Sequence, residues 1–265
     1  MSIVTTNLSK IKNFRDLLEF TGAEYENKIA YVSNDFTKTF KQLEKDVKTL
    51  AGYIIEQGIQ NQEIALIGTP SYEYIVAYMA ITISNNIVVI ISESLELDIT
   101  RSLIETSGFK YAYVDFHSID YAKECLIKKH CESTCGKVED LIEIVTNVKS
   151  TVDVESIEID EKKECIKVFI SETESIMLNQ HIITVNTKHL DSKLEKQAKN
   201  DDYAYVLINN GHGIIFDLAM MLYGVPTFSR NSIKKISKKV ILGKAMISSM
   251  TPLMIEKIKL RLKRE

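Results

Sequence analysis

The sequence predicts an α/β protein with two doubly wound, mostly parallel sheets that carry helices on both faces. Short, continuously apolar runs such as residues 64–67 and 87–91 are typical of strands buried on both faces. The longer segments between such runs carry apolar side chains at helical spacing. Because the two kinds of segment alternate along the chain, we expect parallel strands joined by crossover helices.

The first 60 residues predict a helix, a hairpin and a longer helix. Thr39 is a favoured residue for the start of a helix, and Gly58 suits the position just after a helix end. Asn34-Asp35 has the composition of a hairpin turn. We therefore expect a helix over residues 11–20, strands over 29–33 and 37–40, and a helix from Thr39 through Gln57.

The alternation continues to about residue 129. Serine and aspartate recur before apolar periodic segments, where their oxygens accept hydrogen bonds from the first free N–H groups of a helix. The expected elements are strands over 64–67, 87–91 and 111–114, and helices from Ser71 to 83, from Ser94 or Asp98 to Gly108, and over 120–129.

An acidic, weakly periodic stretch divides the chain. We expect a first α/β subdomain over residues 1–150, a linker over 151–163 and a second subdomain over 164–265. Beyond the linker the alternation resumes, with strands expected over 166–170, 204–208, 225–228 and 240–242, and helices over 190–199, over 214–223, after Asn231 and after Pro252.

Composition limits the classes of partner and cofactor. The chain has 265 residues, of which 45% are hydrophobic and 26% charged, as in soluble globular proteins. Its net charge of −3 gives no reason to expect nucleic acid or an anionic membrane as partner. With no apolar run of membrane length and no signal-peptide core, we expect a cytoplasmic protein with free thiols. The spacing of Cys125, His130, Cys131 and Cys135 matches no familiar zinc site, so no metal is expected.

The most distinctive segment is residues 168–190. An apolar strand leads into a hydroxyl-rich turn, a second apolar run over 181–185 follows, and helix-start chemistry appears at Asn186-Thr187. A phosphate-binding loop needs glycines, because its backbone must turn N–H groups onto an anion without a Cβ in the way. This segment contains no glycine. An ordinary strand–turn–strand with a polar tip would give the same pattern.

The stretch VFISETESIMLNQ resembles the signature loop of adenylate-forming enzymes, roughly F-T-S-G-T-T-G-x-P-K-G. Glu172, Glu174 and Ser175 stand where Gly, Thr and Gly are expected, and Met177-Leu178 replaces Pro-Lys. The resemblance makes Ser171, Glu172, Thr173, Glu174 and Ser175 a degenerate phosphate loop. A like charge at about 4 Å costs roughly 1 kcal/mol in water and roughly 4 at an effective dielectric of 20, so the two glutamates would oppose ATP.

Other stretches resemble the same family in the same order. Residues 39–92 are similar to its helix–strand–helix–strand sequence, and GHGIIFDLAMMLYGVPTF is similar to the helix that lines its acyl pocket. The matching pocket positions are His212, Gly213 and Phe216. The resemblance also implies a ribose-binding aspartate and a lysine on a mobile C-terminal domain, and neither occurs before Glu265. We therefore expect no ATP-dependent adenylation by this chain and no cofactor.

Two functions follow as hypotheses. The first is a catalytically inactive relative of these enzymes that acts as a binding or assembly module, with a ligase, a carrier protein, another pathway enzyme or a second copy as its partner. The alternative is one half of a split acyl-activating enzyme, or an ATP-independent enzyme that uses the retained acyl pocket. A serine nucleophile at Ser171 with His181 or His212 has no supporting motif, and Glu172 with Glu174 is the pattern of a solvated turn.

Overall fold

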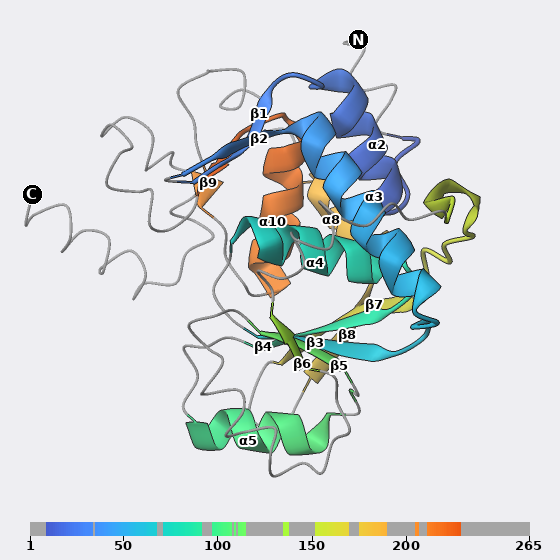
Figure 1. Cartoon of the computed structure of the whole chain (residues 1–265), viewed down its shortest axis with the longest axis vertical. Helices are drawn as coiled ribbons and strands as arrows, with labels where there is room; N and C mark the ends of the chain where they lie inside the picture. Colours follow the sequence, from blue (N-terminus) through green and yellow to red (C-terminus); the bar gives the residue numbers. More distant parts are fainter. Residues whose placement is uncertain are drawn as a thin grey trace, which may run out of the picture.

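The structure is a computed structural model that describes residues 9–33, 35–67, 71–91, 97–107, 109, 111–114, 135–137, 152–169, 175–189, 205–206 and 211–228. Its strands form one sheet of six and one of four. Figure 1 shows the six-stranded sheet with α4 on one face and α5 on the other. The predicted α/β class, with two mostly parallel sheets, is confirmed.

The six-stranded sheet has the order β6-β5-β3-β4-β7-β8. Every neighbouring pair is parallel except β7 and β8, which form an antiparallel hairpin at one edge. The strands predicted over 87–91 and 111–114 have those bounds in the structure. The six strands are β3 Glu63–Ile67, β4 Ile87–Ile91, β5 Tyr111–Val114, β6 Cys135–Lys137, β7 Glu164–Phe169 and β8 Ser175–Asn179.

The four-stranded sheet has the order β2-β1-β10-β9. β1 and β2 are the predicted hairpin around Asn34-Asp35, and β1, β10 and β9 are parallel. In this sheet, strands from near the start of the described chain pair with strands from near its end. Its strands are β1 Ile29–Val32, β2 Thr37–Thr39, β9 Tyr205–Val206 and β10 Thr227–Phe228.

The linker predicted over residues 151–163 lies in the chain between two strands of one sheet. β6 and β7 lie on either side of it in the chain, and both belong to the six-stranded sheet. The predicted subdomains 1–150 and 164–265 therefore share this sheet, since β7 pairs with β4 through Val88↔Ile166 and Ile90↔Val168. An acidic composition marks an exposed connection, but it carries no information about such a distant backbone pairing.

Three helices form a layer between the sheets. α3 (Phe40–Glu56) contacts β1 and β2, whereas α4 (Tyr72–Ile83) contacts β3 and β4. α2 (Phe14–Glu24) packs on both helices. Every residue of α4 except Glu73 is buried, which is the pattern of a helix covered on all sides.

Local chemistry explains where these helices begin and end. The side chains of Thr39 and Gln42 each accept a hydrogen bond from the other residue's backbone N–H, in a capping box at the start of α3. Gly58 follows the end of α3 with φ +72°, as predicted. Ser71 caps α4, also as predicted. α2 begins at Phe14 rather than at residue 11, because the Asn13 side chain accepts from the Asp16 N–H at 2.9 Å.

The remaining helices are α5 Leu97–Thr106, α8 Gln180–His189 and α10 Gly211–Leu222. α10 packs against α8 and α2. The elements predicted over 120–129, 190–199 and beyond 228 lie outside the described residues. None of the helices in the described ranges combines the length and apolarity that crossing a membrane requires.

Candidate functional site

Three parallel strands bring their carboxyl ends to one edge of the six-stranded sheet. β3, β4 and β7 are neighbours in that order, and they end at Ile67, Ile91 and Phe169. Ligands of open α/β sheets bind at this edge, in the loops that follow the strands. The segment that resembles a phosphate loop follows β7, so its strand context is that of a ligand-binding loop.

The loop joins the two strands of the β7–β8 hairpin. The last pair of the hairpin is Phe169↔Ser175, so the connection consists of residues 170–174. Ser175 is the exposed first residue of β8. The other predicted loop residues, Ser171, Glu172, Thr173 and Glu174, lie outside the described residues.

The second half of the hairpin differs from the sequence prediction. The apolar run over 181–185 belongs to α8, and the returning strand is β8, one step earlier in the chain. Helix-start chemistry is present at Asn179, whose side chain accepts from the Ile182 N–H at 2.8 Å. Asn186 lies inside α8, where its amide donates to the Ile182 carbonyl at 2.8 Å.

The two residues at the Pro-Lys positions lie within β8. Leu178 pairs with the fully buried Ile166 and packs against the core. Met177 pairs with Lys167. Leu178 therefore supplies apolar packing where the resemblance would place a phosphate-binding cation.

Lys167 is a cation of the hairpin, but its charge is paired elsewhere. Its Nζ lies 3.2 Å from both carboxylate oxygens of Glu63. Glu63 is the first residue of β3, at the end of the strand opposite to the loop edge. This ion pair directs the lysine away from the place where a phosphate would bind.

The predicted pocket residues lie in α10. His212 and Gly213 are in its first turn, and Phe216 is one turn further on; their side chains are outside the described set. The helix begins at Gly211, three residues before the predicted start, so Gly-His-Gly is part of the helix rather than a loop before it. Asn210, a residue type favoured at helix starts, directly precedes it.

α10 also contains a buried acidic group that the sequence analysis did not predict. Asp217 is 2% exposed, and it influences Tyr78 of α4, which is 1% exposed. Burial raises the pKa of Tyr78 well above its usual value, and the charge of Asp217 and nearby Tyr74 raise it further. The phenol stays protonated at neutral pH, so it can donate a hydrogen bond but cannot serve as a base. The signal was a lone aspartate within the apolar run IIFDLAMML.

A second buried polar group connects β2, α3 and α4. Asp46 accepts from the Tyr72 hydroxyl at 2.7 Å and from Lys38 Nζ at 2.8 Å. Lys38 also lies over the Tyr72 ring, 5.2 Å from its centroid. Because donors and acceptor satisfy one another, this group stabilises the fold rather than forming a binding site.

Metal and thiol chemistry find little support in the described part of the chain. No group of three or more His, Cys, Asp or Glu side chains there could hold a metal ion. Cys125, His130 and Cys131 lie outside the described residues, while Cys135 begins β6. Burial raises the pKa of the Cys165 thiol far above its usual range, which makes it unreactive at neutral pH.

Comparisons with known proteins agree with this geometry. The model of the AMP-binding enzyme family matches residues 18–207. Among solved structures, VinN in complex with L-aspartate is 13% identical, with a TM-score of 0.73, and the match covers 86% of this chain and 64% of VinN. No curated protein matches the sequence significantly.

Two further structures give the same result. The N-terminal domain of FACL13 from Mycobacterium tuberculosis is 15% identical, with a TM-score of 0.68, and 83% of this chain and 57% of that chain are covered. The luciferase-like enzyme of the nonluminescent mealworm Zophobas morio is 16% identical, with a TM-score of 0.68, and the match covers 96% of this chain and 59% of that one. The chain thus spans less than two thirds of the length of these proteins. With its family model matched over more than half of its residues, this chain belongs to the AMP-binding, adenylate-forming enzyme family.

Proposed function

We propose that this chain is a catalytically inactive family member that acts as a binding or assembly module for a ligase, a carrier protein or another pathway enzyme. The observation that carries the proposal is the composition of the connection between β7 and β8. It contains Glu172 and Glu174 and no glycine, at the sheet edge where the family resemblance places a phosphate loop.

Charge and backbone chemistry both oppose nucleotide binding at this edge. A triphosphate approaching the carboxyl end of β7 would meet two carboxylates, each costing roughly 1–4 kcal/mol at about 4 Å, depending on the local dielectric. Without glycine the connection lacks the residue that most readily turns successive N–H groups onto one anion. The nearby cation Lys167 is paired with Glu63, and Leu178 occupies the lysine position.

The intact scaffold favours a binding role. In the described residues both sheets, the capped helices and a continuous apolar core are present, which supports a retained scaffold beside the altered loop sequence. Ile176 of β8 is 45% exposed and Ile182 of α8 is 42% exposed, both on the elements that follow the loop. Ile176 lies next to the loop, where an exposed apolar side chain suits a protein partner better than a small anion; Ile182 lies beyond the opposite end of β8.

Calorimetric titration of the isolated chain with ATP, with and without Mg²⁺, and with AMP tests the loss of nucleotide binding. We expect no binding heat up to millimolar nucleotide. A dissociation constant in the micromolar range would overturn the proposal.

Light scattering after size-exclusion chromatography tests whether the partner is a second copy. If an oligomer becomes monomeric in the double variant Ile176→Asp/Ile182→Asp, but not in the matched control Ile29→Asp, a second copy binds at β8 or α8. Ile29 is 42% exposed and lies on the other sheet. A wild-type monomer at all concentrations would exclude a second copy in favour of a different protein.

A further inference from the structure

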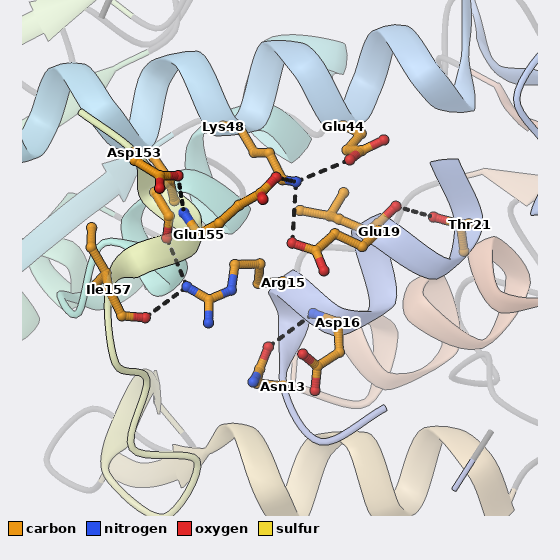
Figure 2. Close-up of polar contacts among 12 residues, drawn as sticks. Asn13, Arg15, Asp16, Glu19, Thr21, Glu44, Lys48, Asp153, Glu155 and Ile157 are labelled. Atoms are coloured by element: carbon orange, nitrogen blue, oxygen red, sulfur yellow. Dashed lines mark hydrogen bonds and ion pairs between the residues drawn. The ribbon is translucent and has the colours of Figure 1, made fainter. Parts of the chain in front are cut away.

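Residues 152–163 form an irregular strap that is fastened to the helical layer by charged side chains. The strap contains one turn of 3₁₀ helix, Val154–Ser156, and runs directly into β7. Figure 2 shows the strap beside α2 and α3, with Arg15, Lys48 and Glu155 between them. Side chains from other elements contact its backbone, among them Asn85, whose amide donates to the Glu158 carbonyl at 3.0 Å.

Arg15 of α2 attaches the strap through its backbone. Its Nη1 donates to the carbonyl oxygens of Val154 and Ile157, each at 2.7 Å (Figure 2). Val154 is the first residue of the 3₁₀ turn, and Ile157 directly follows its last residue. A single guanidinium therefore fixes both ends of the turn with charge-assisted hydrogen bonds.

Lys48 of α3 attaches the same turn through a side chain. Its Nζ lies 2.9 Å from Glu155, 3.0 Å from Glu44 and 3.1 Å from Glu19, so one ammonium joins the strap, α3 and α2 (Figure 2). Burial works against its charge, but hydrogen bonds to the three carboxylates raise the pKa of Lys48 above its usual value. The lysine stays charged, and its hydrogen bond and charge lower the pKa of Glu155.

The apolar attachment of the strap is small by comparison. Val154 is 5% exposed within the core cluster, and Ile159 packs against that cluster. Glu155, in contrast, keeps 67% of its side chain exposed. Because few apolar side chains would leave the core, the strap can detach while the helices beneath it remain folded.

The end of the strap is attached to the first turn of α8 and to the residues before β3, and it continues into β7. The His181 N–H, in the first turn of α8, donates to the Glu161 carbonyl at 2.8 Å. Lys163 Nζ donates to the Asn61 side chain, just before β3, and β7 begins at the next residue. Movement of the strap would thus be transmitted to β7 and to the start of α8.

We propose that residues 152–163 are an electrostatic latch, held closed by Arg15 and Lys48, whose opening depends on ionic strength and loosens the start of β7 and the first turn of α8. At about 0.1 M salt the screening length is about 10 Å, and at 1 M it falls to about 3 Å, so exposed ion pairs weaken sharply over this range. The latch is independent of nucleotide binding.

Hydrogen–deuterium exchange on the full chain tests the latch. Arg15→Gln removes both carbonyl contacts, and we expect exchange in 152–163 to rise roughly tenfold, as for the loss of charge-assisted hydrogen bonds. Lys48→Gln is expected to give a smaller rise, of roughly threefold. Lys45→Gln is the matched control, because Lys45 is exposed on the same helix and has no ion pair to the strap; its exchange should equal that of the wild type.

Salt provides a second readout that a merely destabilised protein would not reproduce. Between about 0.05 and 1 M NaCl, wild-type exchange in 152–163 should rise roughly threefold while the peptides of α4 stay unchanged, and Lys48→Gln should lose most of this dependence. If exchange rose equally in α4 and the strap, or if the strap were insensitive both to salt and to Arg15→Gln, the latch would be disproved.

Discussion

The helical layer and the β7–β8 region are stabilised by different interactions. In α4 nearly every side chain is buried among apolar neighbours between α3 and the large sheet. The strap and β8 depend more on ion pairs, a helix cap and half-buried residues, although Cys165 and Ile166 of β7 are buried. The difference indicates that most of the buried apolar core of the described residues lies in the helices rather than in the hairpin. We therefore expect the hairpin to tolerate changes in its chemistry without loss of the fold.

Truncating a core side chain should have the largest effect. Ile81→Ala in α4 removes a fully buried side chain, and we expect a loss of about 2–5 kcal/mol in the free energy of unfolding. Ile176→Ala in β8, where the side chain is 45% exposed, should cost less than about 1 kcal/mol. Urea unfolding followed by far-UV circular dichroism compares the two. Equal losses would contradict the difference between the regions.

High pH should destabilise the helical layer next most strongly. Burial, together with the charge and hydrogen bond of Asp46, raises the pKa of Tyr72, and burial with nearby Glu24 raises the pKa of Tyr25 to about 12. A phenol with a raised folded pKa contributes stability that is fully present below its unfolded pKa of about 10 and is lost as the pH rises through the folded pKa.

Phenolate absorbance checks this expectation. Of the 12 tyrosines, Tyr25, Tyr72, Tyr78 and Tyr113 should ionise only above the pH at which exposed ones do, or on unfolding. Tyr72→Phe should remove one late-titrating group, whereas all 12 ionising together near pH 10 in the folded protein would refute the expectation.

Helix caps offer a matched pair of smaller effects. Ser71→Ala removes the cap of the buried α4, and we expect a loss of about 1 kcal/mol in global stability. Asn179→Ala removes the cap of α8. Because α8 starts at the hairpin, its effect should be mainly local, seen as faster amide exchange in the first turn with little change in the urea midpoint. A larger global loss from Asn179→Ala would reverse the comparison.

Acid should act weakly and only on the strap. Lys48, through its hydrogen bond and its charge, lowers the pKa of Glu155; Arg15 and Lys41 also face this carboxylate. The contribution of the Glu155 carboxylate to the stability of the strap is therefore present above the unfolded pKa of about 4.3. This contribution is lost as the pH falls through the lower folded pKa. Amide exchange in 152–163, corrected for its intrinsic pH dependence, should rise below about pH 4 in the wild type but not in Glu155→Gln.

Elements with strong local signals were predictable from the sequence. β4 and β5 have their predicted bounds, and Thr39 and Ser71 cap their helices, because each signal lies within a few residues. The apolar run over 181–185 is helical, which apolar periodicity alone does not reveal, because it does not separate a short strand from a helix. The start of this helix is held by residues far away in the sequence. The buried Gln180 side chain accepts from the Phe14 N–H at 2.8 Å and donates to the Thr82 carbonyl at 3.3 Å.

The candidate site was predictable only in part. The sequence predicted a strand ending close to where β7 ends, but it placed His212 and Gly213 before a helix starting at 214, whereas they lie in the first turn of α10. It did not reveal that Asp217 is buried near Tyr78, nor that Lys167 is paired with Glu63, since both depend on which elements pack together.

The most direct test of the central proposal compares ATP binding by the wild type and by Glu172→Gly/Glu174→Thr/Ser175→Gly, which restores the family's residues at these positions. The three positions lie in or next to the connection between paired strands, so the fold should be retained. We expect no calorimetric binding by the wild type and measurable binding by the variant, with a gain of roughly tenfold or more for each carboxylate removed. Adenylation should not return, because Leu178 still occupies the lysine position. Micromolar ATP binding by the wild type, or equal absence of binding in a folded variant, would contradict the assignment of lost nucleotide use to these residues.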